Sequence, residues 1–396
     1  MRVIAVRQEG FKWAQHEGVH VKGYLFEDGH FYRGEELAIR IAAFESLAAF
    51  EKFILTVNGS FALLINRANL SVAAVDRLRS IPLFYARDAD TWIVGDDAGE
   101  VSKAAGLPAR NDTRSLQEFA LSGFVLGAAT LISGLYQIRA GERVIFDGDA
   151  PQESYYYIHV GTTRIPEDET AEFDRLDSIS TNWGTRLVQS AESRPLVLPL
   201  SGGYDSRYIA AVLRQLKYPS LVAYTYGRPN SPEVARSEKV ARQLDIPWYF
   251  VEYTDEAYRS FLASESHKRY CAFAHQHSSL PHYQEFLALQ GLINRGVIDS
   301  DSIIVPGFCG DLLGGSYVPQ EVPLGHGDAL LAKGIVRHID EQQLYLKPFL
   351  RDRCSKQVLE HLESELAGIA PPPPLMCRIL CRRMMPSSQS IRSPNT

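Results

Sequence analysis

The chain has 396 residues, of which 45% are hydrophobic and 22% charged, so it is long and apolar enough to form two folded domains of ordinary size. Its formal net charge of −6 argues against the basic surface of a protein that binds nucleic acid or an anionic membrane. No stretch approaches the roughly 20 apolar residues that cross a bilayer, and the N-terminal sequence is unlike a secretory signal. Five cysteines without a CxxC pair are typical of a cytoplasmic protein.

The first 160 residues have the pattern of a mostly β domain. Runs rich in β-branched and aromatic residues predict strands, and one helical spacing of apolar residues predicts a helix between them. An Asn58-Gly59 pair inside the second run predicts a hairpin turn. The expected strands are Val19–Phe26, Phe53–Ile65, Leu70–Asp76 and Thr91–Val94, and the expected helix is Ala38–Phe53.

From about residue 170 the predicted strands and helices alternate. This alternation predicts a doubly wound parallel sheet, which binds ligands at the carboxyl ends of its strands. The expected strands are Arg194–Leu200, Leu221–Tyr226, Ile246–Tyr253 and Ser302–Val305, and the expected helices include Glu172–Val188 and Glu233–Leu244.

The most informative stretch is the loop SGGYDS, which follows the strand that ends at Leu200. Gly202 and Gly203 allow backbone N–H groups to approach an anion at the following helix N-terminus. Ser201 and Ser206 add hydroxyl donors. Asp205 would repel a phosphate unless a cation lay between them, which indicates Mg²⁺ beside a polyphosphate. The simpler alternative is a capped turn, and the lack of a following lysine excludes a Walker loop.

A second glycine-rich loop repeats this arrangement. The predicted strand Ser302–Val305 runs into PGFCGDLLGGS, in which Gly307 and Gly310 precede the carboxylate of Asp311. Both loops follow strands of the same predicted sheet, so we expect them at the same edge. The alternative is a glycine-rich turn without a ligand.

These loops resemble parts of the asparagine synthetase family. The first is similar to the SGGxDS loop of PP-loop ATP pyrophosphatases, and the second resembles the family loop G-E-G-x-D-E-x-x-G-G. Residues 57–62 (VNGSFA) and 76–85 (DRLRSIPLFY) look like the G-x-F-A strand and DRxGxxPLYY hairpin of the glutamine amidotransferase domain. Residues 118–155 resemble the segment that joins that domain to the synthetase domain. All these pieces occur in the family order.

The resemblance implies an α/β protein with two domains. Residues 1–160 would form an Ntn-hydrolase-like α/β/β/α sandwich, and residues 170–370 a PP-loop domain with an adenine nucleotide α-hydrolase-like, doubly wound parallel sheet. Residues 371–396 are expected to be a disordered tail, with the chain truncated or frameshifted near residue 370. The implied cofactors are ATP and Mg²⁺. The residues implied to bind ATP or pyrophosphate are Ser201, Gly202, Gly203, Asp205, Ser206, Gly307 and Gly310, and those implied to bind Mg²⁺ are Asp205 and Asp311.

The sequence departs from the family at two places that carry chemistry. Glutamine-hydrolysing members use a cysteine at residue 1 after methionine removal, whereas this chain has Arg2 and no cysteine before Cys271. We therefore expect no glutaminase activity, the alternative being a misassigned start codon. In the second loop, Phe308 and Leu312 replace the two family glutamates. The resemblance therefore does not identify the residues that would bind the substrate.

A histidine-rich segment also invites a functional interpretation. His275, His277 and His282 lie within eight residues, and imidazole is a common metal ligand. No carboxylate nearby supplies the usual partner of such a ligand. We expect the segment to line the substrate or nucleotide pocket rather than to bind a metal.

The resemblance implies an AMP-forming amide ligase that joins a small-molecule or peptide carboxylate to an amine or ammonia. No nucleic-acid or membrane partner is expected, and a homodimer is compatible with the family. One alternative is a noncatalytic nucleotide-binding remnant or scaffold. Another, an RNA thiolation enzyme of the PP-loop group, would need catalytic cysteines and a basic surface that the sequence lacks. The carboxylate and the nitrogen donor are not identified by the sequence.

Overall fold

The computed structural model describes residues 1–7, 10–108, 110–158, 169–307, 310, 360, 361 and 364. The chain divides into two units. The first includes Met1–Val160 and, from much later in the sequence, Cys271–Pro281, while the second includes Gly161–Tyr270 and His282–Gln342. No helix among the described residues is both long and apolar enough to cross a membrane. The tail expected from residue 371 onward lies outside the described residues.

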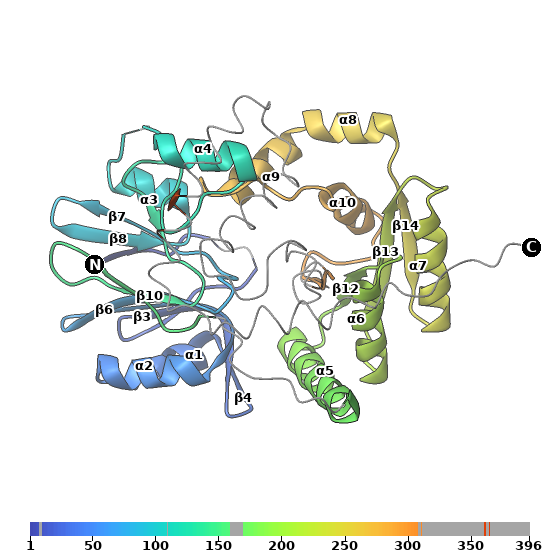
Figure 1. The fold of residues 1–396 in the computed structure, drawn as a ribbon, viewed down its shortest axis with the longest axis horizontal. Helices are drawn as coiled ribbons and strands as arrows, with labels where there is room; N and C mark the ends of the chain where they lie inside the picture. Colours follow the sequence, from blue (N-terminus) through green and yellow to red (C-terminus); the bar gives the residue numbers. More distant parts are fainter. Residues whose placement is uncertain are drawn as a thin grey trace, which may run out of the picture. The chain divides into compact units, whose positions relative to one another are not determined.

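Two β-sheets form the centre of the first unit (Figure 1). The larger sheet contains β2 (Ala14–His16), β3 (Val19–Glu27), β4 (His30–Arg33), β5 (Asn58–Arg67), β6 (Leu70–Val75), β10 (Glu142–Ile145) and β11 (Gln152–Tyr155). Its strands are antiparallel in the order β11-β10-β6-β5-β3-β2, with β4 paired to β3. The smaller sheet contains β1 (Arg2–Ile4), β8 (Thr91–Gly95), β7 (Phe84–Asp88) and β9 (Tyr136–Gln137), in that order. Its β1–β8 pair is parallel.

Helices cover the outer faces of both sheets. Helices α1 (Gly34–Ala42) and α2 (Leu47–Thr56) pack on the larger sheet through a core that contains Phe50 and Phe61. A second core, with Leu64 and Tyr85, fills the space between the sheets. Helix α3 (Ala98–Ala104) packs on the smaller sheet, and α4 (Thr113–Ser122) follows it in the chain. These α/β/β/α layers confirm the fold class implied for the first unit (Figure 1).

Three local predictions in this unit are wrong. The single helix expected over Ala38–Phe53 is broken, because Ser46 begins a new helix by accepting a hydrogen bond from the Ala49 N–H at 3.3 Å. The residues expected to start a strand at Phe53 form the last turn of α2. Asn58-Gly59 is not a hairpin turn, because both residues begin β5 and pair with β3.

The sheet of the second unit is entirely parallel. It contains β14 (Trp248–Glu252), β13 (Leu221–Gly227), β12 (Leu196–Pro199) and β15 (Ile303–Ile304), in that order across the sheet. The four strands expected from sequence are therefore confirmed. Because β12 comes first in the chain but lies between β13 and β15, the strand order reverses beside it.

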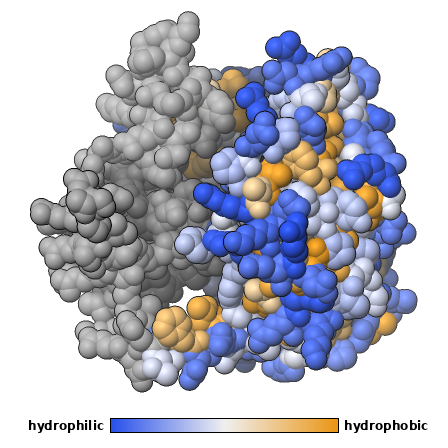
Figure 2. All heavy atoms as spheres, turned by 90° about the vertical axis from the view of Figure 1, so that its right-hand side faces the viewer, coloured by the Kyte–Doolittle hydropathy of each residue, from blue (hydrophilic) through white to orange (hydrophobic). Residues whose placement is uncertain are grey.

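Helices lie on both faces of this sheet, as expected of a doubly wound fold. On one face, residues of α5 (Glu169–Ala191), α6 (Tyr204–Gln215) and α7 (Pro232–Gln243) share a core with Leu198. On the other face, α10 (Phe286–Asn294) packs against Val197 and Tyr224. Helices α8 (Asp255–Ala263) and α9 (Glu265–His275) follow β14. Figure 2 shows hydrophilic residues on the coloured surface, with smaller groups of hydrophobic residues among them.

A strained turn follows β6 in the segment that resembles DRxGxxPLYY. The buried carboxylate of Asp76 holds this turn by accepting hydrogen bonds from the N–H groups of Leu78 and Ser80. Arg79 stands where the pattern has glycine, and its φ of 56° is in the left-handed region. Its Nε and Nη2 atoms are buried and have no hydrogen-bond partner among the described residues. Burial lowers the pKa of the Arg79 guanidinium to about 10.

Replacing Arg79 with glycine is expected to stabilise the first unit by about 1 kcal/mol, because it removes backbone strain and a buried guanidinium two of whose nitrogens have no described hydrogen-bond partner. Ala89→Gly is the matched control, because the exposed Ala89 also has a left-handed φ, 48°. Its replacement by glycine relieves backbone strain without removing a buried charge. Urea unfolding would be followed by hydrogen–deuterium exchange in peptides of the first unit. If Arg79→Gly raised the free energy of unfolding no more than Ala89→Gly does, burial of the Arg79 guanidinium would not destabilise the first unit, contrary to this prediction.

Candidate functional site

The loop between β12 and α6 is closed on itself by two hydroxyl groups. Ser206 Oγ accepts a hydrogen bond from the Ser201 N–H at 3.1 Å, and Ser201 Oγ accepts one from the Gly203 N–H, also at 3.1 Å. Gly203 is the N-cap residue of α6 and has no side chain to cap the helix. The first N–H groups of α6 therefore have no side-chain cap within the described part of the chain, and N–H groups at such a helix start can bind an anion.

The loop that follows β15 meets this first loop. Because β15 pairs in parallel with β12, both chains leave the sheet at the same edge. A Cβ atom at Gly307 would lie 3.0 Å from Ser206 N, and one at Gly310 would overlap the carboxylate of Asp205. Only glycine therefore fits at position 310 while Asp205 keeps this position. The edge lies where the strand order reverses, which is where open α/β sheets bind ligands.

The structure thus brings together most of the residues predicted for the phosphate site, namely Ser201, Gly203, Asp205, Ser206, Gly307 and Gly310. Gly202 lies in the same loop, beside Arg236 of α7. Among the described residues, the carboxylate of Asp205 has no hydrogen-bond or ion-pair partner. The second implied Mg²⁺ ligand, Asp311, lies outside the described residues, as do Phe308 and Leu312.

A cavity of about 430 Å³ lies beside the two loops. Its described lining includes three carboxylates, those of Asp205, Glu233 and Glu285, and no lysine, arginine or histidine. It also includes Tyr224 and Tyr226, two residues apart on β13. The alternation of side chains along a strand places both rings on the same face of the sheet.

One tyrosine of this cavity is bonded to one of its carboxylates. Tyr224 is completely buried, and its hydroxyl donates a hydrogen bond to Glu285 Oε2 at 3.2 Å. Burial and then the charge of Glu285 raise the pKa of Tyr224 far above its usual range, and the same two causes raise the pKa of Tyr226 to about 12. Both phenols therefore stay neutral near pH 7, and Tyr224 remains a hydrogen-bond donor.

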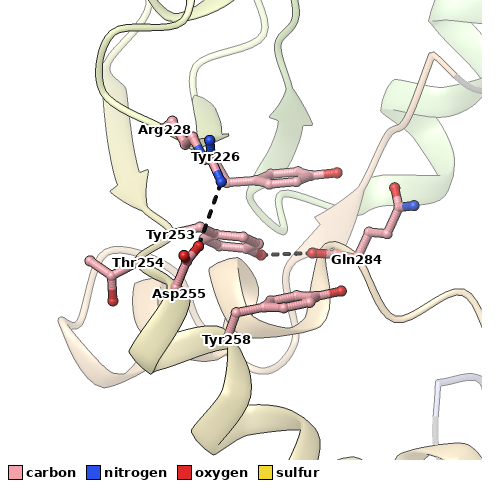
Figure 3. A pocket seen from close by; sticks show the side chains of 8 residues that line it. Tyr226, Arg228, Tyr253, Thr254, Asp255, Tyr258 and Gln284 are labelled. Carbon is pink, nitrogen blue, oxygen red and sulfur yellow. Dashed lines mark hydrogen bonds and ion pairs between the residues drawn. The ribbon is translucent and has the colours of Figure 1, made fainter.

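Tyr226 also forms part of a second cavity, of about 330 Å³, at the ends of β13 and β14 (Figure 3). The ring centroids of Tyr226 and Tyr253 are 5.0 Å apart, and those of Tyr253 and Tyr258 are 6.0 Å apart. Arg228 and Asp255 form an exposed ion pair at 3.6 Å in the same lining. A row of stacked tyrosines therefore connects the two cavities.

Sequence reasoning did not identify these tyrosines or Glu285. The alternation in LVAYTYG could have shown that Tyr224 and Tyr226 share one face of a strand. Tyr253 and Glu285 come from other elements, and no local pattern in the sequence links them to β13.

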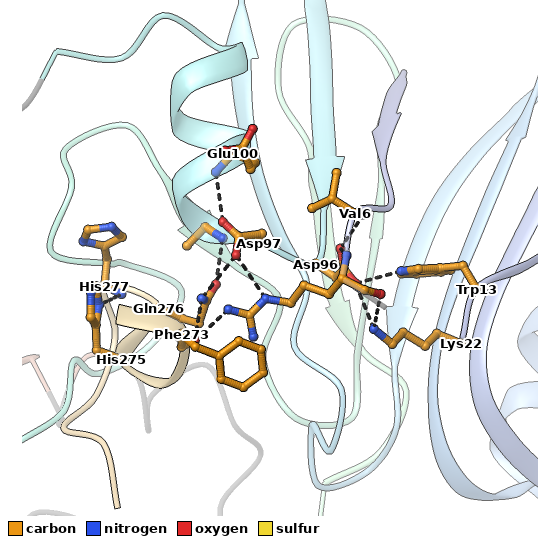
Figure 4. Close-up of polar contacts among 12 residues, drawn as sticks. Val6, Trp13, Lys22, Asp96, Asp97, Glu100, Phe273, His275, Gln276 and His277 are labelled. Atoms are coloured by element: carbon orange, nitrogen blue, oxygen red, sulfur yellow. Dashed lines mark hydrogen bonds and ion pairs between the residues drawn. The ribbon is translucent and has the colours of Figure 1, made fainter. Parts of the chain in front are cut away.

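In the first unit, the buried carboxylate of Asp96 is hydrogen-bonded to several polar groups near the start of the chain (Figure 4). Asp96 accepts hydrogen bonds from the Val6 N–H at 3.0 Å, from Trp13 Nε1 at 2.7 Å and from Lys22 Nζ at 3.1 Å. Asp96 and Lys22 are 1% and 5% exposed, so their ion pair is shielded from water. Arg2 is the first residue of β1. The polar groups of this Asp96 network are therefore hydrogen-bonded to one another.

The histidine-rich segment belongs to the first unit as far as Pro281. The side-chain oxygen of Gln276 accepts a hydrogen bond from the Ala98 N–H at 2.8 Å, and His275 Nδ1 accepts one from the His277 N–H at 2.8 Å (Figure 4). Burial lowers the pKa of both histidines. Among the described residues, no three His, Cys, Asp or Glu side chains are grouped as metal ligands. That the segment lines a substrate or nucleotide pocket stays a prediction.

Alanine at position 310 tests whether the two loops meet. Because its Cβ atom would overlap the carboxylate of Asp205, Gly310→Ala is expected to push that side chain from its rotamer and to destabilise the second unit by about 0.5–1.5 kcal/mol. Gly291→Ala is the control, since the nearest atom to a Cβ there is Val251 Cγ1 at 3.7 Å, an ordinary contact. Urea unfolding with hydrogen–deuterium exchange of β12 and β13 peptides would measure both variants. Equal stability of the two would contradict the contact.

Comparisons with known proteins connect this site to a family. The asparagine synthase family matches residues 187–276, which contain the Ser201–Ser206 loop. Asparagine synthetase [glutamine-hydrolyzing] 3 of Bacillus subtilis is 27% identical over 270 residues, which cover 65% of this chain and 40% of the relative's length. The chain therefore spans less than half of that relative.

Solved structures were also compared. An NH3-dependent NAD synthetase from Campylobacter jejuni is 15% identical, with 53% of this chain and 92% of that chain covered and a TM-score of 0.25. A glutamine phosphoribosylpyrophosphate amidotransferase from B. subtilis is 11% identical, with 64% and 52% covered and a TM-score of 0.24. The sequence matches confirm the resemblance that the motifs predicted: residues 187–276 carry an asparagine synthase-family sequence.

Proposed function

We propose that the chain is an ATP-dependent, AMP-forming amide ligase that activates a carboxylate and transfers its acyl group to an amine or ammonia. The observation that carries this proposal is the meeting of two glycine loops around Asp205, at the reversal point of a parallel sheet. Glycines at 307 and 310 keep side chains away from the uncapped start of α6. This arrangement suits a polyphosphate, and the family match supports ATP as its source.

The chemistry begins when the substrate carboxylate attacks the α-phosphate of ATP and pyrophosphate leaves. The N–H groups at the start of α6 and the hydroxyls of Ser201 and Ser206 bind the pyrophosphate, which lowers the barrier by stabilising the charge that develops on it. The open carboxylate of Asp205 fits Mg²⁺, which Asp311 would help to hold and which would neutralise phosphate charge. An amine nitrogen then bonds to the acyl carbon as the bond to AMP breaks.

Asp205→Ala is expected to lower carboxylate-dependent exchange of labelled pyrophosphate into ATP by about 100-fold or more, because the variant loses electrostatic stabilisation at the reacting phosphate. The assay would use a panel of amino acids, sugar acids and peptides as the carboxylate. Asp245→Ala is the control, since this exposed residue of the same unit pairs only with Arg214 among the described residues. Unchanged exchange by Asp205→Ala, with a normal circular dichroism spectrum, would remove the role assigned to Asp205.

We also propose that the first unit does not hydrolyse glutamine. The side chain at the start of β1 is that of Arg2, which is no nucleophile for an amide, and the sequence has no cysteine before Cys271. The closed network around Asp96 supports a structural role for this part of the unit.

The purified protein is therefore expected to release no glutamate from glutamine, with or without ATP and the carboxylate panel. Where amide formation with ammonia as the nitrogen donor is detected, ammonium chloride should support it and glutamine should not. Glutamate would be measured by a coupled dehydrogenase assay, with a known glutaminase as the positive control. Glutamate release above the rate of the heat-inactivated protein would contradict the proposal.

A second candidate, a noncatalytic nucleotide-binding protein, is favoured by one observation. Phe308 and Leu312 stand where the family loop has glutamates, so acidic groups of that loop are lost. ATP binding without pyrophosphate exchange across the carboxylate panel would support this candidate over the ligase.

A further inference from the structure

Glu285 is the N-cap residue of α10. Side chains at this position can accept a hydrogen bond from the first turn of the helix. Glu285 makes no such bond, and among the described residues its one hydrogen-bond partner is the hydroxyl of Tyr224. The carboxylate is thus held on the wall of the cavity that also contains the phosphate loop.

The cavity has the size and walls of a nucleoside pocket. Its volume of about 430 Å³ lies in the range of small-molecule sites. Ser201, Asp205 and Ser206 line it at the phosphate loop, and the tyrosines of β13 supply an aromatic wall. A nucleotide whose phosphates lie on the loop would therefore place its base and sugar beside Tyr226, where a flat ring can stack.

An ionised carboxylate on such a wall selects among bases by its hydrogen-bonding character. It has acceptor sites only, and one of them is taken by Tyr224. The remaining sites favour a base edge that presents N–H groups, such as the exocyclic amino group of adenine. A base without that donor would leave the carboxylate unpaired and partly desolvated.

The geometry points to Glu285 as the residue that selects the adenine base, by accepting a hydrogen bond from its exocyclic amino group, with Tyr224 as the residue that positions the carboxylate. This inference rests on the proposed ATP site. The residue that determines which base binds is then Glu285, at the start of α10. Helix α10 packs on the opposite face of the sheet from α6 and α7.

The other carboxylates of the cavity are less suited to this role. Glu233 is exposed in the first turn of α7, where water competes for its oxygens, and Asp205 lies against Gly310 beside the phosphate loop. Glu285 alone among the three is half-buried and bonded to a buried donor. Glu233 is therefore a control within the same cavity.

The experiment compares Mg²⁺-ATP with purine riboside triphosphate, which lacks only the amino group. Dissociation constants would be measured by isothermal titration on the full chain. The wild-type protein is expected to bind ATP roughly tenfold to 100-fold more tightly than the analogue, as for a hydrogen bond to a charged group. In Glu285→Met, which removes the acceptor but keeps the length of the side chain, this ratio should fall to about 2 or less.

Three further variants separate specificity from structure. Glu285→Gln retains an acceptor oxygen and should give an intermediate ratio, and Tyr224→Phe, which frees the carboxylate to move, should reduce the ratio in part. Glu233→Gln, with the same change of charge in the same cavity, should keep the wild-type ratio. A ratio unchanged in Glu285→Met, or equal loss of both nucleotides, would overturn the inference, and so would tighter binding of GTP than of ATP by the wild type.

The same proteins distinguish this inference from the proposed function. Pyrophosphate exchange with an unchanged ratio in Glu285→Met would retain the ligase and reject the role of Glu285. A ratio that depends on Glu285, without exchange for any carboxylate, would reject the ligase and retain the role of Glu285. Absence of binding for both nucleotides in the wild type would reject both.

Discussion

The arrangement of the second unit depends on the pairing of one short strand. β12 has β13 on one side and β15 on the other, and its register with β15 pairs Leu196 with Ile303 and Val197 with Ile304. Those two pairs bring the chain after β15 to the edge where the Ser201–Ser206 loop begins. A shift by one residue would turn alternate side chains to the other face and move Gly310 away from Asp205. The meeting of the two loops, and with it the proposed phosphate site, thus depends on the register of the sheet as well as on the loops themselves.

The absence of side chains at this edge has an electrostatic meaning. Asp205 has its carboxylate against backbone, where a Cβ atom of residue 310 would lie, and no cationic side chain lines the described part of the cavity. For the proposed ATP site, the described residues supply backbone dipoles rather than cationic side chains, and the proposed Mg²⁺ would balance the phosphate charge.

The second unit could be predicted from sequence in most of its strands, because short, continuous apolar runs such as Leu196–Leu198 mark buried parallel strands and glycine-rich loops follow them. The first unit could be predicted less well. Phe53, Ile54 and Leu55 have strand-like side chains, yet the cap at Ser46 and the packing of Phe53 and Ile54 in the core make them helical. Glu285 and Tyr253 could not be assigned to the site, because their proximity to β13 arises only when α10 and β14 pack in the sheet.

The strap formed by Cys271–Pro281 has a consequence for how the protein is made. Its contacts with the first unit are specific, because the Val125 N–H donates to Ser278 O at 2.8 Å and the Leu131 N–H donates to His277 O at 2.7 Å. A ribosome adds about 5–20 residues per second, so roughly 120 residues and on the order of ten seconds separate the end of the first stretch from its strap. During that interval the N–H groups of Val125 and Leu131 lack these partners. The nascent first unit therefore lacks these two backbone hydrogen bonds until Cys271–Pro281 has been translated.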